Sequence, residues 1–408
     1  LDPRSVRGIG GVWYGPFGAT GCRVVTQARI ECLSVPGTGA GYVYTVAIAG
    51  QYFTWTGPSA ARQSYGRPSL LALGGVGATN ASTEGGQSVV LTGRNFGAAF
   101  NLSSPQWAVR YLLATPGGRN LSYVATGCTA TVAHIELTCT TSPGVGRALD
   151  WSVSIDGLVS TTPQSDYGVP IVTRVGAADG SSITTAVVGS WVWVWGVNFG
   201  PAGNDSRGST VDSITYGPTS AEATYVATTW EVISHRLLRF AAVPGVGAGL
   251  GIIVTVAGQA SLPGTGAATF GYRRPAVASV LPRFFDTEFV AGSVDVTVTG
   301  TGFGLDDSGA AAQVTLGHAS DSTLMTVAVS GGRILGNGQQ QLMFRLPPGI
   351  GPNRAVRIGV YRRSLGADPR FTIYSDAVAD TPGMTVTVTE TKEALTAFRD
   401  FLVELGAL

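Results

Sequence analysis

The sequence predicts an all-β protein built from tandem two-sheet β-sandwiches. Its 408 residues include 58 glycines, about twice the usual share, so turns must be frequent. Short segments rich in Val, Thr and Trp alternate apolar and polar residues, which is the pattern of half-buried strands. Landmark sequences recur about every 100 residues, and a unit of that length with many short strands is typical of a sandwich.

Two kinds of turn carry the repeat. Pro-Gly-x-Gly occurs at 36–39, 143–146, 244–247 and 348–351. Asn-Phe-Gly occurs at 95–97 and 198–200, and Gly-Phe-Gly stands in the equivalent place at 302–304. A proline opens each of three units, at Pro68, Pro170 and Pro275. Because independent landmarks agree on one period, we interpret the chain as repeated copies of one module.

The strand before each aromatic-glycine turn shows the period-two pattern most clearly. These strands are expected at 89–93, 192–196 and 296–300, and each ends in glycine. Later strands at 151–155 and 252–256 also run into glycine turns. Each unit is therefore predicted to consist of short strands joined by turns.

From Pro68 to Val169 these motifs follow one another as Val-x-Leu-Thr-Gly-x-Asn-Phe-Gly, two cysteines, Pro-Gly-x-Gly and Val-x-Ile-Asp-Gly. This order resembles an IPT/TIG domain, the immunoglobulin-like module of plexins, some transcription factors and many surface proteins. The resemblance implies tandem immunoglobulin-like β-sandwiches. It also implies adhesion, signalling or spacer roles, without catalytic residues shared across the family.

The resemblance divides the chain into five parts. Residues 68–169, 170–274 and 275–375 are expected to be whole domains. Residues 1–67 are expected to be an incomplete half-domain, and residues 376–408 a C-terminal strand followed by a short helix. The helix is predicted over 392–405 from an apolar stripe, and we expect it to dock on a domain or a neighbour.

The resemblance also implies how the four cysteines pair. Both pairs would flank a hairpin, giving the disulfides Cys22–Cys32 and Cys128–Cys139, and closing such loops stabilises a fold by roughly 2–3 kcal/mol each. Phe240 and Phe344 stand where later units would carry the second cysteine. A zinc site is the alternative, although the sequence contains no C-x-x-C.

Four N-x-Ser sequons predict covalent N-glycans at Asn80, Asn101, Asn120 and Asn204. Together with the disulfides they predict a secreted or cell-surface glycoprotein from a eukaryote. The alternative is that the sequons are unused in a bacterial product. The chain starts at Leu1, as a processed product or a fragment would.

Several function classes are not expected. A formal net charge of +1 gives no excess of basic residues of the kind that binds nucleic acid. No apolar run in the sequence is long enough to span a membrane. His134, His235 and His318 occur one per unit without a metal-ligand spacing. Asp205, Asp306 and Asp307 could sit in calcium-binding loops but do not match EF-hand spacing. We therefore expect no catalytic residues, no metal, no cofactor and no enzymatic activity.

One strand breaks the pattern of the repeat. Trp191, Trp193 and Trp195 occupy the face that should point outward, where other units carry Ser, Thr and Asp. Three outward tryptophans would expose more apolar surface than soluble monomers usually leave open. Three interpretations stay open: protein or the chain's own glycan covers them, they stack on sugar rings of a ligand, or a register change turns them inward.

The two ends look complementary. Trp13 and Tyr14 belong to a strand of the second half of a sandwich, whereas Met384, Val386 and Val388 repeat the inward face of a first-half strand. Since no second half follows it, we expect this C-terminal strand to lie unpaired within its own chain. We expect the C-terminal strand of one copy to complete the N-terminal half-domain of the next, giving a head-to-tail homopolymer. The alternative is that residues 1–408 are part of a longer chain of the same modules, in which case both half-domains result from where the chain was cut.

The sequence therefore predicts a structural subunit of an extracellular filament or surface appendage. The competing prediction is a carbohydrate-binding or adhesion ectodomain that uses the three tryptophans.

Overall fold

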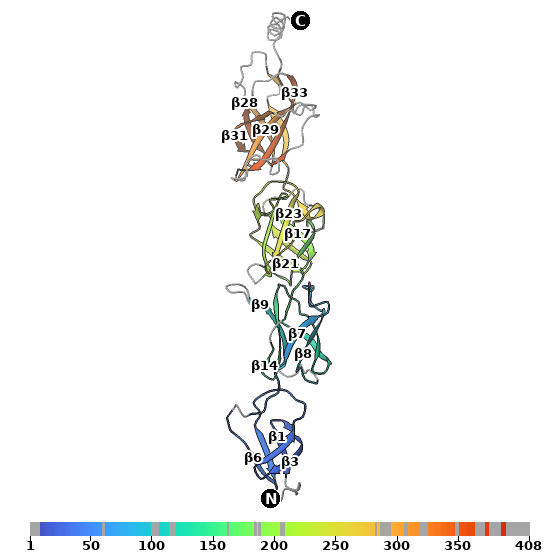
Figure 1. Ribbon diagram of the computed structural model, residues 1–408. Helices are drawn as coiled ribbons and strands as arrows, with labels where there is room; N and C mark the ends of the chain where they lie inside the picture. Colours follow the sequence, from blue (N-terminus) through green and yellow to red (C-terminus); the bar gives the residue numbers. More distant parts are fainter. Residues whose placement is uncertain are drawn as a thin grey trace, which may run out of the picture.

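The computed structural model describes residues 9–58, 62–98, 106–113, 120–160, 163–182, 186, 189–204, 209–281, 284–285, 295–305, 309–317, 325–346, 351–363, 372–374 and 385–388. These residues form tandem immunoglobulin-like β-sandwiches, which confirms the predicted fold class. Figure 1 shows four units in a row from the N-terminus to the C-terminus, here called units 1 to 4. The predicted C-terminal helix over 392–405 lies outside the described residues.

Unit 3 shows the complete sandwich. Its first sheet has the order β16-β17-β22-β21-β18, from β16 (Ile171–Gly176), β17 (Trp191–Val197), β22 (Leu237–Ala241), β21 (Trp230–Ser234) and β18 (Gly203–Asn204). Its second sheet has the order β20-β19-β23-β24, with β25 also on β23, from β19 (Val211–Gly217), β20 (Tyr225–Val226), β23 (Leu250–Val256), β24 (Gln259–Ala260) and β25 (Thr269–Phe270). A 3-10 turn, η4 (Gly266–Ala268), precedes β25. The inward residues of both sheets form one core.

Unit 2 repeats this arrangement. One sheet has the order β11-β12-β8-β7, from β7 (Ser69–Gly74), β8 (Ser88–Arg94), β11 (Thr126–Val132) and β12 (Glu136–Thr140). The other has the order β10-β9-β13-β14, with β15 on β13, from β9 (Ala108–Leu113), β10 (Leu121–Val124), β13 (Leu149–Ile155), β14 (Leu158–Val159) and β15 (Gln164–Ser165).

Unit 4 has the sheets β26-β28-β32-β31 and β27-β35-β33-β29-β30, with β34 on β33. The strands are β26 (Ala276–Leu281), β27 (Phe284–Phe285), β28 (Asp295–Thr301), β29 (Ala310–Gly317), β30 (Met325–Val327), β31 (Val329–Ile334), β32 (Gln340–Arg345), β33 (Gly351–Arg362), β34 (Thr372–Tyr374) and β35 (Thr385–Val388).

Unit 1 differs from the others. Its one four-stranded sheet has the order β2-β1-β5-β6, from β1 (Ile9–Tyr14), β2 (Phe17–Gly18), β5 (Tyr44–Ile48) and β6 (Gln51–Thr54). Opposite lies only the hairpin of β3 (Thr20–Thr26) and β4 (Arg29–Leu33). Among the described residues no strand takes the place that β8, β17 and β28 hold beside the equivalent of β4.

In the three Pro-Gly-x-Gly loops that the structure describes, at 36–39, 143–146 and 244–247, both glycines have a physical reason. The last glycine has φ of +93° at Gly39, +117° at Gly146 and +123° at Gly247, which is a region that L side chains rarely adopt. A Cβ on the first glycine would collide with a tyrosine ring, for example on Gly245 with Tyr272. Only glycine therefore fits at these two positions.

Paired tyrosines hold the residue that precedes each loop, and we call each pair a tyrosine clamp. The hydroxyls of Tyr216 and Tyr272 lie 2.9 Å apart in unit 3. The backbone N–H of Val243 donates to Tyr216 (2.9 Å), and the Tyr272 hydroxyl donates to the carbonyl of Val243. The equivalent groups are Tyr111, Tyr167 and Ser142 in unit 2, and Tyr14, Tyr65 and Val35 in unit 1. Burial raises the pKa of the Tyr167 hydroxyl, and the neighbouring Tyr111 raises it further, so this hydroxyl keeps its proton to a higher pH than a free tyrosine does.

The variable residue of each loop reaches into the next unit. Val145, from unit 2, is buried and belongs to the core of unit 3, and Val246, from unit 3, belongs to the core of unit 4. A tyrosine of the unit that contributes the loop holds its backbone: Tyr123 exchanges two hydrogen bonds of 3.0 Å with Val145, and Tyr225 does the same for Val246. Neighbouring sandwiches are thus joined through a shared core.

Polar contacts add to the joint between units 2 and 3. The ring nitrogen Nδ1 of His235 lies 3.0 Å from Oγ1 of Thr83, and Arg236 forms a forked ion pair with Glu84 at 2.7 and 3.2 Å. The Asn198 amide accepts from the backbone of Thr83 and donates to the carbonyl of Val169. Asn198 has a φ of +64°, a conformation that asparagine tolerates better than most residues. Its backbone therefore forms the turn, while its side chain holds the segment between units 2 and 3 through the carbonyl of Val169.

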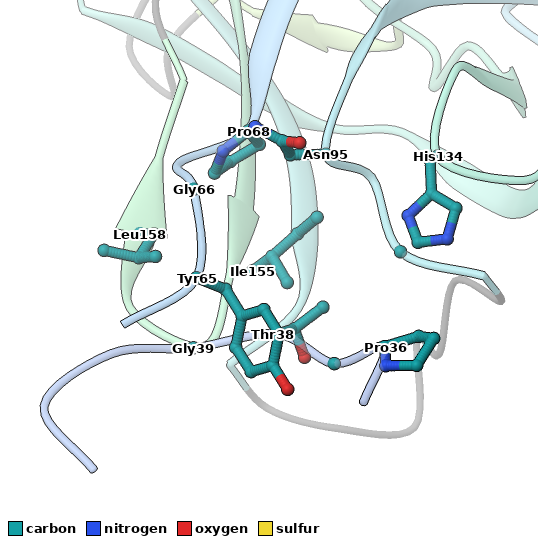
Figure 2. Close-up of a pocket in the computed structure, with 12 residues that line it drawn as sticks. Pro36, Thr38, Gly39, Tyr65, Gly66, Pro68, Asn95, His134, Ile155 and Leu158 are labelled. Atoms are coloured by element: carbon teal, nitrogen blue, oxygen red, sulfur yellow. The ribbon is translucent and has the colours of Figure 1, made fainter. Parts of the chain in front are cut away.

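The joint between units 1 and 2 is more open and more polar. Thr38, the variable residue of the first loop, donates to Asp156 (2.6 Å), which also accepts from the Trp107 indole (2.6 Å). Figure 2 shows the cavity of about 170 Å³ that remains between Tyr65 and Thr38 of unit 1 and His134 and Ile155 of unit 2.

We predict that Val145→Asp lowers the free energy of unfolding by about 3 kcal/mol, because it places an unpaired carboxylate in the core of unit 3. Chemical denaturation measures the loss, and small-angle scattering should show a less rigid rod. Val132→Asp is the matched control, since Val132 is exposed in the same unit. Equal effects of both substitutions would contradict the role of Val145 as a joint.

We also predict that acid weakens the joint between units 2 and 3. Burial lowers the pKa of His235 below its usual 6.5, more than the nearby Glu84 raises it. The unfolded chain therefore binds more protons near pH 6, so stability is full above pH 6.5 and falls as the pH drops through the lowered pKa. Denaturation curves between pH 5 and 8 should show this slope in the wild type. A slope that stays unchanged in His235→Gln would exclude His235 as its source.

Candidate functional site

The first candidate site is the open side of unit 1, here called the acceptor groove. Its volume is about 570 Å³, and its apolar lining comes from both layers of the half-sandwich. Val12, Tyr14, Tyr44 and Val46 contribute from the four-stranded sheet, and Ile30 and Cys32 from β4. In unit 3 the equivalents of Ile30 and Cys32 are Leu238 and Phe240, which are fully buried by Val194 and Val192 of β17.

The free edge of β4 adds backbone groups to this groove. Strand β4 pairs with β3 on one side, whereas β22 pairs with both β21 and β17. Unpaired N–H and C=O groups along a strand edge are a template for another strand. The groove thus combines an open strand edge with a mixed lining, in which Glu31, Ser34 and Gln63 lie among the apolar residues. An open edge beside apolar pockets is the combination that strand addition uses.

Of the two residues predicted for this site, the structure places one in the groove. Tyr14 lines it and joins the clamp of unit 1. Trp13 belongs to the opposite face of β1, because successive strand residues alternate, and its ring packs near Tyr52 at 6.3 Å. Trp13 therefore belongs to the half-domain expected to act as acceptor, but not to the lining of the groove, and its part in an interface stays a prediction.

The predicted donor strand is paired within its own chain. Val386 lies opposite Arg354 and Val388 opposite Gly351 of β33, and β27 pairs on the other side of β35. The expectation that this strand lies unpaired was therefore wrong, since the open edge of β33 offers it partners in unit 4. Met384 lies outside the described residues.

The second candidate site is the tryptophan face, formed by Trp191, Trp193 and Trp195 on β17. The three side chains point outward, so the interpretation of a register change is excluded: Val192 and Val194 are the buried residues of this strand. Arginines stack on the indoles. The guanidinium of Arg174 lies 4.1 Å from the Trp195 ring, and that of Arg239 lies 4.4 and 5.2 Å from Trp191 and Trp193.

Part of the tryptophan face stays open despite these contacts. Trp191 is 39% exposed. Arg239 is also fixed by Glu231, at 2.7 Å. The face therefore presents aromatic rings, guanidinium groups and a carboxylate side by side, which suits a ligand with both apolar and hydroxyl-bearing surfaces.

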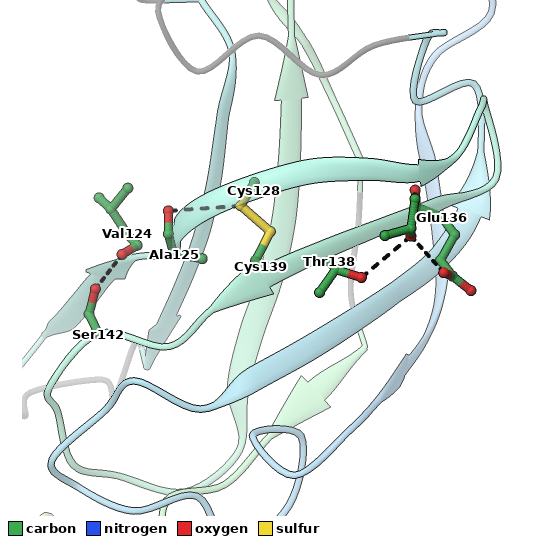
Figure 3. Close-up of a disulfide and its surroundings, with 8 residues drawn as sticks. Val124, Ala125, Cys128, Glu136, Thr138, Cys139 and Ser142 are labelled. Atoms are coloured by element: carbon green, nitrogen blue, oxygen red, sulfur yellow. Dashed lines mark hydrogen bonds between the residues drawn. A yellow bond between two sulfur atoms is a disulfide. The ribbon is translucent and has the colours of Figure 1, made fainter.

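Both predicted disulfides are present, Cys22–Cys32 between β3 and β4 and Cys128–Cys139 between β11 and β12. Figure 3 shows the second of them. A glycine with φ near +60° precedes the first cysteine in each hairpin, Gly21 and Gly127, and the strand register shifts there. In unit 3 the apolar pair Trp230–Phe240 replaces the disulfide, and in unit 4 Val329–Phe344 does. The four cysteines are thus oxidised rather than available to zinc.

The sequons lie in different settings. Asn80 and Asn120 are exposed, Asn80 in a turn and Asn120 just before β10. Asn204 belongs to the edge strand β18. Asn101 lies outside the described residues, as do His318 and the acids Asp205, Asp306 and Asp307.

Within the part of the chain that the structure describes, no three His, Cys, Asp or Glu side chains gather where they could hold a metal ion. Nor does that part contain a helix long and apolar enough to cross a membrane. The joint residues were missed by sequence reasoning, although tyrosines at 14, 111 and 216 and at 65, 167 and 272 follow the same period as the loops and could have revealed the clamps.

No family model and no curated protein matches this chain. Among solved structures the chain is similar to the full extracellular region of plexin A4, with 13% identity and a TM-score of 0.21. That match covers 86% of this chain and 26% of the plexin, so this chain spans about a quarter of the plexin's length. A second similar structure is SGBP-B from a complex xyloglucan utilization locus in Bacteroides uniformis, with 13% identity, a TM-score of 0.21 and coverage of 75% of this chain and 97% of that one. Similarities this low carry no functional inference.

We predict that Arg239→Gln destabilises unit 3 by about 1–2 kcal/mol, since it removes two cation–π contacts worth roughly 0.5–1 kcal/mol each at an exposed site. Denaturation followed by tryptophan fluorescence measures this loss. Arg110→Gln, on an exposed position of β9, should have little effect. If the two variants are equally stable, the stacking on the tryptophan face does not stabilise the unit.

Proposed function

We propose that this chain is a structural subunit of a secreted, glycosylated extracellular filament or surface appendage, assembled head-to-tail by β-strand complementation from IPT/TIG-type modules. The observation that carries the proposal is the acceptor groove of unit 1, where a half-sandwich leaves its core and the edge of β4 open. The proposed role is mechanical and needs no catalytic residue or cofactor.

The joints suit a load-bearing role. Units follow one another in a row, and two of the three joints bury a valine of one unit in the core of the next (Figure 1). Such joints resist bending more than a flexible linker does, because bending would expose apolar surface. Two disulfides favour an extracellular setting, since disulfides persist in oxidising compartments.

The proposed donor is the segment Thr385–Val388 of a second copy. Its sequence, with Met384 before it, repeats that of 294–299, in which Val296 pairs with Phe344 and Val298 with Leu342. By this register Val386 would lie opposite Cys32 and Val388 opposite Ile30. To act as donor, the segment would leave its place between β27 and β33 for a position beside β4 of the next copy.

A contact of this kind is heterologous, because the donor and the acceptor are different surfaces of the same chain. Repeated from copy to copy, it propagates into a fibre unless rotation closes a ring. The two ends of the chain thereby define the polarity of the filament.

We predict that Val386→Asp combined with Val388→Asp abolishes assembly, because it would place two carboxylates in the acceptor core. Light scattering and electron microscopy of the full chain measure particle size. The matched control is Thr385→Asp with Thr387→Asp, which adds the same charges at the alternate positions and should leave polymers intact. Deletion of residues 376–408 should also give monomers.

A wild type that stays monomeric at all concentrations, or polymers that survive the deletion, would overturn the proposal. A monomer would favour the competing function, a carbohydrate-binding or adhesion ectodomain, for which the partly open tryptophan face is the supporting observation. Binding of soluble oligosaccharides that is lost in Trp191→Ala would then identify that face as the ligand site.

A further inference from the structure

The two disulfides occupy equivalent hairpins but differ in what covers them. Cys22–Cys32 joins β3 to β4, and Cys128–Cys139 joins β11 to β12. The cysteines of the two pairs are 10 and 11 positions apart, so both bonds close loops of nearly equal length. Since loop length sets the stabilisation in the chain-entropy model, the two bonds constrain their hairpins to a similar extent. The difference between them lies in their surroundings.

The disulfide of unit 2 is part of a complete core. Cys128 and Cys139 are both buried among the core residues of that unit. Strand β8 lies beside β12, with Val89 directly opposite Cys139. A thiol in solution therefore reaches these two sulfur atoms only when the sandwich opens locally.

The disulfide of unit 1 lacks this cover. Cys22 and Cys32 hold the positions of Cys128 and Cys139 but are only half-buried. Cys32 also lines the acceptor groove, because no described strand of unit 1 lies beside β4 as β8 lies beside β12. The groove thus connects this disulfide with the solvent.

We propose that Cys22–Cys32 is a thiol–disulfide exchange site, opened by an external dithiol that enters the acceptor groove, and that its opening releases β4. Cys128–Cys139 is the structural counterpart. Exposed disulfides are the ones that exchange with thiols, whereas structural ones resist the same reductant. The proposal rests on the half-sandwich of unit 1 and does not depend on filament assembly.

The exchange has two steps. A thiolate of the dithiol attacks Sγ of Cys32, the S–S bond breaks, and Cys22 leaves as a thiolate. The second thiolate of the reagent then attacks the reagent's sulfur in the mixed disulfide, which releases the thiolate of Cys32 and closes the reagent into a disulfide. Two electrons pass from the dithiol to the protein. The two protons that the dithiol loses to water are balanced by the two that the cysteine thiolates take up.

Reduction would loosen the second layer of unit 1. Within the described residues, β3 and β4 pair only with each other, whereas β12 is paired with both β11 and β8. The ion pair of Arg23 with Glu31 also joins β3 to β4, but it lies at the surface, where such pairs contribute little. The disulfide therefore replaces support that a neighbouring strand gives in unit 2, and its opening alters the groove that β4 lines.

The experiment uses the full oxidised chain at concentrations where light scattering gives a monomer, because a strand seated beside β4 would cover Cys32. Dithiothreitol is the dithiol probe. Samples taken over time are blocked with an alkylating reagent, and mass spectrometry reports the reduced fraction of each disulfide. We expect Cys22–Cys32 to be reduced at least about tenfold faster than Cys128–Cys139, since the second bond requires local opening. Equal rates, or faster reduction in unit 2, would overturn the proposal.

Denaturant provides the control for burial. In concentrated guanidinium chloride both disulfides are exposed and should be reduced at similar rates. A difference of the same size in the unfolded chain would come from the residues next to the cysteines rather than from the groove, and would also overturn the proposal.

Hydrogen exchange tests the release of β4. After selective reduction, amides of β3 and β4 should exchange at least about tenfold faster, whereas those of β11 and β12 should stay unchanged. Cys22→Ser combined with Cys32→Ser should give the same increase without reductant, and reoxidation of the wild type should reverse it. Unchanged exchange in β3 and β4 would contradict the proposed release.

Discussion

The hydrogen bonds that tyrosine hydroxyls make to the backbone beside the first three Pro-Gly-x-Gly loops are the constraint on which the rest of the structure depends. In units 1 to 3, a clamp such as Tyr216–Tyr272 fixes the residue before the loop, and in units 2 and 3 a third tyrosine fixes the loop itself. A buried backbone group left without a partner costs about 1–3 kcal/mol, so the loop has one well-defined position. Only a loop held in this way can present its valine to the next core.

The two candidate sites are departures from this repeated scheme. Unit 1 keeps the clamp and the loop but leaves open the space that β17 fills in unit 3, so the groove is an unfilled core rather than a specialised pocket. Unit 3 keeps the complete core but carries tryptophans where its neighbours carry smaller residues, Ser88, Val90 and Thr92 in unit 2 and Asp295, Thr297 and Thr299 in unit 4. Both sites therefore lie where the module has been altered without loss of the joint.

The module itself could be predicted from the sequence, because its signals are local. Period-two alternation placed Val192 inside and Trp193 outside, and the resemblance to a known module paired Cys128 with Cys139. The joints could not be predicted in this way. The hydrogen bond between His235 and Thr83 joins residues 152 positions apart in the sequence, and the sequence around either residue gives no sign of the other. Trp13 and Tyr14 were both assigned to the acceptor half-domain, and alternation along β1 leaves only Tyr14 in the groove. The pairing of β35 with β33 likewise depends on which edge is open after folding.

The shared cores have a consequence for how such a chain can grow or shrink during evolution. Val145 is encoded with unit 2 but completes the core of unit 3, and Val246 stands in the same relation to unit 4. A duplication that copies one sandwich from strand to strand keeps this relation only if the loop before it also has an apolar residue at its variable position. The segment that must be duplicated as a whole therefore differs from the structural domain. It runs from one Pro-Gly-x-Gly loop to the next and includes the joint between two sandwiches.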